Sequence, residues 1–174
     1  VPVGDGCILA GVYKGWEDLM EAGYIGRIPQ IIAVQAEGSA NITSNLSYET
    51  PVFKDSSTIA DSISVTIPRN YYMAKDYLNK YNGKGIQVSD KSIMASSKRL
   101  AEKYGIFSEP AAAAAYAGYL KLKEANEIEE NSKNVVLLTG SGLKDTDACQ
   151  DIVIPLKPVS NTEELVNRIK EFMR

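Results

Sequence analysis

The sequence contains no histidine, and it has only two cysteines among its 174 residues, Cys7 and Cys149. Without histidine the usual general base near neutral pH is missing, which excludes Ser-His-Asp and Cys-His catalysis within this chain. The two cysteines lie far apart and do not have the CxxC spacing of a zinc site. We therefore expect two free thiols, with neither a metal site nor a disulfide.

An excess of basic residues is also missing, because 19 Lys and Arg stand against 22 Asp and Glu, for a net charge of −3. Such a balance argues against a nucleic-acid partner. No apolar run approaches the roughly 20 residues that a membrane-spanning helix needs, and no signal-peptide pattern opens the chain. We expect a cytoplasmic protein that binds neither nucleic acid nor membrane.

The hydrophobic pattern alternates between the two periods of secondary structure. Helical spacing covers residues 7–22, 70–80, 89–104, 110–125 and 161–173. Short apolar runs at 30–35 and 85–88 are typical of strands, and the apolar run within residues 134–142 is typical of a strand buried on both faces. Residues 36–61 predict a long irregular segment, with a helical turn near 58–63. This order predicts a single α/β domain over 1–174, with a three-layer, mostly parallel sheet covered by helices on both faces.

Two glycine loops stand where such a sheet binds ligands, at the carboxyl ends of strands. The first is VPVGDG at residues 1–6, which runs directly into a helix, and the second is LTGSG at residues 138–142. The glycines of the first loop let the backbone approach a phosphate, and the free N–H groups of the helix start favour an anion. An ordinary strand-to-helix turn explains the same residues. We expect the Asp5 carboxylate to cap the helix, because a carboxylate close to a phosphate is unfavourable.

Five blocks of sequence carry a more specific resemblance. They are VPVGDGCILAGVYKG, RIPQIIAVQAEGSA, TIADSISV, GIFSEPAAAAAYAGYLKL and VVLLTGSGLKD, in that order over about residues 1–145. The chain resembles the carboxyl-terminal half of threonine synthase and its threonine synthase-like relatives, pyridoxal-phosphate enzymes of fold type II. The resemblance implies a tryptophan synthase beta-like fold, pyridoxal 5'-phosphate as cofactor, a small amino-acid substrate and a homodimeric parent protein. It also implies that this chain is a carboxyl-terminal fragment.

The resemblance assigns roles to seven residues. The first loop would bind the cofactor phosphate through Gly4, Asp5, Gly6, Cys7 and Ile8. Thr139 would hydrogen-bond the pyridine nitrogen, and Glu109 would lie near the cofactor. A neutral hydroxyl at that nitrogen favours elimination and replacement at the β carbon over transamination. The alternatives remain a turn residue at the end of a strand for Thr139 and a carboxylate at a helix start for Glu109.

The family's cofactor-binding lysine lies upstream of the glycine loop, and no residue of this chain matches it. Lys98 is expected on the polar side of its helix, in solvent. Lys144 is expected to pair with Asp145 or to face solvent. The resemblance therefore implies no catalytic residue in this chain, and an isolated fragment that is inactive.

The reaction implied for the parent protein converts O-phosphohomoserine and water to threonine and phosphate. Departures from the family's pattern leave alternatives open. Ser141 stands where threonine synthases commonly have His, and Asp5 and Cys7 stand where they have Asn or Gly. The alternatives are a serine/threonine or diaminopropionate ammonia-lyase, a subunit of a 2-amino-4-oxopentanoate thiolase, and a non-catalytic module that binds a phosphorylated metabolite.

Overall fold

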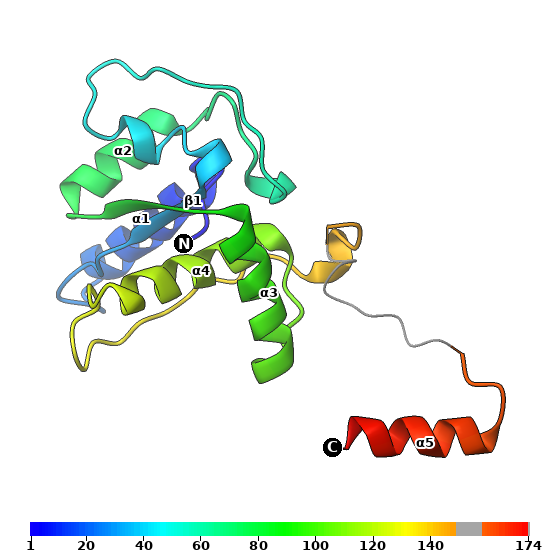
Figure 1. Cartoon of the computed structure of the whole chain (residues 1–174). Helices are drawn as coiled ribbons and strands as arrows, with labels where there is room; N and C mark the ends of the chain where they lie inside the picture. The colour runs from blue at the N-terminus through cyan, green and yellow to red at the C-terminus, as the bar shows by residue number, and fades with distance from the viewer. Residues whose placement is uncertain (149–157, 174) are drawn as a thin grey trace.

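The structure is a computed structural model that describes residues 1–148 and 158–173 (Figure 1). The helices are α1 (Cys7–Glu21), α2 (Tyr71–Lys80), α3 (Asp90–Tyr104), α4 (Pro110–Glu124) and α5 (Thr162–Phe172), and the strands are β1 (Ile32–Ala36) and β2 (Lys84–Val88). All the helices and both strands lie within about two residues of their predicted positions. Cys149, which the sequence predicts to be a free thiol, lies outside the described residues.

The two strands are parallel, with Ile32 opposite Lys84 and Ala36 opposite Val88. The start of the chain runs along the other edge of β1. There Val3 N–H donates to Val34 O over 2.9 Å, and Val34 N–H donates to Val1 O over 2.9 Å. The predicted parallel sheet is therefore present on a small scale, with β1 at its centre.

Helices cover both faces of this sheet, as the sequence predicts. Side chains alternate along a strand, so Ala33 and Val34 belong to two separate apolar clusters. Helices α1 and α2 supply one cluster, while α3 and α4 supply the other, which includes most of the alanines of α4. The short side chains of α4 let it lie close to β1 and β2 (Figure 1).

The strand predicted within residues 134–142 is wrong. The segment forms no strand, and Val135 is 90% exposed. Val136 and Leu138 pack against the α4 cluster, so only part of the run is covered. A strand requires a neighbour for its N–H and C=O groups. Within the described residues, backbone pairing of this segment begins at Gly140, whose carbonyl accepts from Glu109 N–H over 3.1 Å.

The irregular segment predicted at residues 36–61 is confirmed, and buried polar side chains hold it in place. Gln35 Oε1 accepts from the N–H groups of Ile42 and Thr43 over 3.0 and 2.8 Å. Asn41 Nδ2 donates to three carbonyl oxygens, those of Lys54, Val65 and Thr66. These bonds satisfy backbone groups that no sheet or helix satisfies. The predicted turn near 58–63 forms a single turn of 3₁₀ helix, η3 (Asp61–Ile63).

Three helix ends follow their local signals. Ser89 Oγ accepts from Ser92 N–H over 3.2 Å at the start of α3, and Gly105 ends that helix with a φ of 66°. Asn161 Oδ1 accepts from Glu164 N–H over 2.9 Å at the start of α5. The predicted apolar side of α5 is partly exposed, with Ile169 at 49%. In the part of the chain that the structure describes, none of the helices combines the length and the apolar character of a membrane span.

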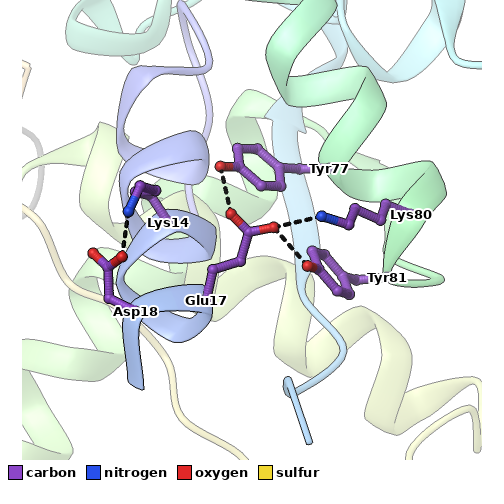
Figure 2. A network of polar contacts seen from close by, with 6 residues as sticks. All are labelled: Lys14, Glu17, Asp18, Tyr77, Lys80 and Tyr81. Atoms are coloured by element: carbon purple, nitrogen blue, oxygen red, sulfur yellow. Dashed lines mark hydrogen bonds and ion pairs between the residues drawn. The ribbon is translucent and has the colours of Figure 1, made fainter. Parts of the chain in front are cut away.

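Helices α1 and α2 are joined by a polar network around Glu17 (Figure 2). Its carboxylate accepts from Lys80 Nζ over 2.7 Å, from the Tyr81 hydroxyl over 2.6 Å and from the Tyr77 hydroxyl over 3.0 Å. The Tyr13 ring stacks on both tyrosines, with ring centroids 5.2 and 5.5 Å away. The hydrogen bonds from Lys80 and Tyr81 lower the pKa of Glu17 from 4.5 to about 2.

This pKa predicts how the α1–α2 contact responds to acid. A carboxyl whose pKa is lowered by folding stabilises the folded state fully above about pH 4.5, and that stabilisation is lost as the pH falls toward 2. We expect Glu17→Gln to lower the urea midpoint at pH 6, with the difference from wild type shrinking between pH 4.5 and 2. Tyr81→Phe removes one donor to Glu17, so it should shift the same loss to a higher pH. Parallel profiles for wild type and Glu17→Gln would contradict this role.

Candidate functional site

The first glycine loop is shaped by close packing inside the chain. Gly6 has a φ of 90°, a left-handed conformation that favours glycine. A Cβ on Gly6 would lie 3.0 Å from Cβ of Ala74 in α2. A Cβ on Gly4 would lie 2.9 Å from Cα of Ile63 in η3. Both glycines are therefore needed for packing, and they do not by themselves distinguish a phosphate loop from an ordinary turn.

The start of α1 is the part of this loop that can receive an anion. The first backbone bond at the start of this helix joins Ala10 N–H to Gly6 O over 3.0 Å. The N–H groups of Cys7 and Ile8 precede that bond, so they have no acceptor within the helix. Both residues are exposed, and the first turn of α1 holds no acidic side chain. This end of the helix therefore presents donors and positive potential to solvent.

The predicted helix cap by Asp5 is wrong. Gly6 occupies the N-cap position, and α1 has no side-chain cap. The Asp5 carboxylate accepts instead from the Arg69 N–H over 3.0 Å and from the Arg69 guanidinium over 2.8 Å. Arg69 holds the pKa of Asp5 below its usual value. The Arg69 guanidinium is positively charged, so it binds the Asp5 carboxylate more strongly than a neutral N–H at the start of α1 would.

Glu109 lies at a junction of three loops. It occupies the N-cap position of α4, which confirms the alternative of a carboxylate at a helix start, and its side chain makes no cap bond. The residue is 3% exposed, and its Oε2 accepts from Ser62 Oγ over 3.3 Å. A Cβ on Gly140 would lie 1.9 Å from Glu109 Oε1, so only glycine leaves room for this carboxylate.

The two lysines considered in the sequence differ in their surroundings. Lys98 is 56% exposed and lies 3.8 Å from Glu102, which confirms the prediction of a solvated lysine. Lys144 Nζ lies 3.9 Å from Oε2 of Glu109, and this ion pair replaces the predicted one with Asp145. The Lys144 side chain is nevertheless 66% exposed, as the solvent alternative predicts.

These contacts connect the predicted site segments. The Gly4 loop packs against η3, Ser62 of η3 donates to Glu109, and Glu109 N–H donates to Gly140 O beside Thr139. Thr139 itself is exposed. Ser62 lies in the TIADSISV block, but neither it nor Arg69 was identified from the sequence, because they reach their partners across 47 and 64 residues.

Similarity to known proteins shows the family of this chain. Residues 1–140 match the model of the family "Pyridoxal-phosphate dependent enzyme". The chain belongs to this family. It is 34% identical over 151 residues to threonine synthase from Methanocaldococcus jannaschii, covering 85% of this chain and 37% of that protein. It is 35% identical over 153 residues to threonine synthase from Halalkalibacterium halodurans, covering 88% of this chain and 42% of that protein.

Two enzymes of known structure share the fold of this chain. Threonine synthase from Escherichia coli superposes with a TM-score of 0.64 at 18% identity, over 96% of this chain and 37% of that one. Threonine deaminase isoform 2 from Solanum lycopersicum gives 0.69 at 24% identity, over 87% and 42%. The chain spans about two fifths of the length of the curated relatives above. The resemblance to threonine synthases of fold type II is confirmed.

The loop fits the phosphate of the family's cofactor. The outward N–H groups of Cys7 and Ile8 are suitable donors at the positive end of α1. The carboxylate within the loop, that of Asp5, is turned to Arg69. The binding set predicted from the resemblance, which adds Gly4, Gly6, Glu109 and Thr139 to these three, stays a prediction.

Proposed function

We propose that this chain is the carboxyl-terminal, cofactor-binding portion of a pyridoxal-phosphate-dependent lyase of the threonine synthase type. The whole protein would convert O-phosphohomoserine and water to threonine and phosphate. The observation that supports this most directly is the identity of 34–35% with two threonine synthases over some 150 residues. The expected cytoplasmic location and homodimeric parent belong to the same proposal.

Five residues of the site have a proposed task. The N–H groups of Cys7 and Ile8 hold the phosphate, while Gly4 and Gly6 allow η3 and α2 to pack behind the loop. When bound, the cofactor supplies an electron-withdrawing ring. The Thr139 hydroxyl would bond to the ring nitrogen without giving it a positive charge. Because no lysine of this chain matches the family's, we propose that the isolated chain binds the cofactor without turnover.

A second candidate reaction is elimination from serine or a related amino acid. Ser141 stands in place of the histidine common in threonine synthases, and its Oγ accepts from Leu143 N–H over 3.3 Å. That hydroxyl therefore forms a hydrogen bond within its own loop. It replaces an imidazole that could act as a base or bind a substrate phosphate. Assays of the full-length protein with O-phosphohomoserine and with serine separate the two reactions.

Thiol protection tests cofactor binding, because Cys7 lies in the proposed phosphate loop and is exposed. We would measure alkylation of Cys7 by iodoacetamide in a Cys149→Ser variant, which keeps a single thiol. Pyridoxal phosphate and inorganic phosphate should slow the reaction severalfold and saturably, because the phosphate covers the start of α1. Pyridoxal, which lacks the phosphate, is the matched control and should leave the rate unchanged. Equal protection by pyridoxal, or none by any ligand, counts against the proposed function.

A further inference from the structure

Asp5 places a negative charge inside the loop that is proposed to bind a phosphate. It stands between Gly4 and Gly6, one residue before the N-cap of α1. A carboxylate and a phosphate dianion a few Å apart repel each other, even at the dielectric constant of water. The loop can therefore bind a phosphate well only if the charge of Asp5 is balanced or turned away.

Residues 69 and 70 hold the loop from the side of α2. Asp5 Oδ1 accepts from Arg69 N–H over 3.0 Å, and Asp5 Oδ2 accepts from the Arg69 guanidinium over 2.8 Å. Asn70 N–H donates to Asp5 O over 3.2 Å, and Asn70 Nδ2 donates to Gly6 O over 3.3 Å. Asp5 and Gly6 are thus fixed by four hydrogen bonds from a single dipeptide.

The same contacts bring two helix starts together. Asn70 is the N-cap residue of α2 and Gly6 is the N-cap residue of α1, so the last of these bonds joins the two N-caps. Neither helix has an acidic side chain in its first turn. Within these two helix starts and the loop, Asp5 is the negative charge and Arg69 is the charge that balances it.

We propose that Arg69 is a positioning residue for the cofactor phosphate, which neutralises Asp5 and holds its carboxylate away from the start of α1. The inference rests on the proposed function, because it concerns the same phosphate loop. The lowered pKa of Asp5 beside Arg69 supports the pairing. The Arg69 side chain is 86% exposed, so its importance lies in charge balance at the loop and not in core packing.

The test is a charge cycle with inorganic phosphate as the probe, read by protection of Cys7 in the Cys149→Ser background. Arg69→Gln should weaken phosphate binding roughly tenfold, the size expected for one uncompensated charge near a dianion in a water-like dielectric. Asp5→Asn should tighten binding by a similar factor, because it removes the repulsion. The variant with both substitutions should bind within about twofold to threefold of wild type.

Lys14→Gln is the matched control, because it removes one positive charge from an exposed ion pair with Asp18 on α1, away from the loop. It should leave phosphate affinity unchanged, and thermal melting should show that all variants fold. Equal affinity of Arg69→Gln and Lys14→Gln, in a protein whose wild type binds phosphate, overturns the inference and leaves the proposed function standing. Equal weakness of Arg69→Gln and the double variant also overturns it, since Arg69 would then act on something other than Asp5. A wild type that binds neither phosphate nor pyridoxal phosphate overturns the proposed function, and the inference with it.

Discussion

Alanine at position 118 is expected to destabilise the chain by about 1–3 kcal/mol, the usual cost of forcing extra volume into a packed interface. A Cβ on Gly118 would lie 2.5 Å from Val34 Cγ2 and 3.0 Å from Ile86 Cδ1. Val34 is 2% exposed and β-branched, so its side chain has few other rotamers available. Helix α4 would have to lift from β1 and β2 to admit a single methyl group.

The matched control is the same substitution at Gly15 in α1. A Cβ built on Gly15 would meet no heavy atom within 4 Å beyond its chain neighbours and the backbone of its own helix, and the residue is exposed. Gly15→Ala should therefore raise stability by up to about 1 kcal/mol, because alanine loses less backbone entropy than glycine in a helix. Urea unfolding of both variants checks the expectation of opposite signs. A stabilising Gly118→Ala would show that α4 does not approach the sheet as closely as described.

The helices and three of their ends were predictable because their signals are local. Ser89, Gly105 and Asn161 each cap a helix through groups within a few residues, so their roles follow from sequence neighbours alone. The covering of the sheet on both faces also followed from the sequence. Alternating strand and helix patterns leave few other ways to bury apolar runs.

The errors occur where distant groups compete. The apolar run within residues 134–142 has the composition of a buried strand, but a strand forms only beside a partner, and Val135 is 90% exposed. Asp5 has the right position to cap α1, but Arg69 lies 64 residues further along the chain and takes its carboxylate. A sequence pattern shows what a side chain can do locally, and it does not show which partner folding brings to it.

The candidate site was predictable only through the resemblance. Glycine turns before a helix are common, and both Gly4 and Gly6 turn out to have packing reasons for their missing side chains. The ordered blocks pointed to Glu109 near the site, but no pattern predicted its burial or its bond from Ser62. Family membership thus selected the residues, and the tertiary contacts supply the physical reasons for the loop's shape.

Alanine at position 140 is expected to disrupt the junction between the two glycine loops. A Cβ there would lie 1.9 Å from Glu109 Oε1 and 2.3 Å from its Cδ. The Glu109 side chain is 4% exposed, so it has little room to move, and moving it breaks the bond from Ser62 and the pairing with Lys144. Gly140 does not have a positive φ, so the free-energy cost of the substitution comes from the steric clash and not from backbone strain.

We expect Gly140→Ala to cost about 1–3 kcal/mol in unfolding free energy, and to weaken protection of Cys7 by pyridoxal phosphate because Thr139 moves with its neighbour. Gly26→Ala, where an added Cβ would meet no other part of the chain within 4 Å, is the control and should change stability by less than about 0.5 kcal/mol.

Shortening the Glu109 side chain should relieve the clash with a Cβ at position 140. In the Glu109→Ala background the further cost of Gly140→Ala should fall by about 0.5–3 kcal/mol, the coupling energy typical of residues in direct contact. Additive effects of the two substitutions would mean that Glu109 does not occupy the space beside Gly140. Glu109 would then not connect the phosphate loop to Thr139.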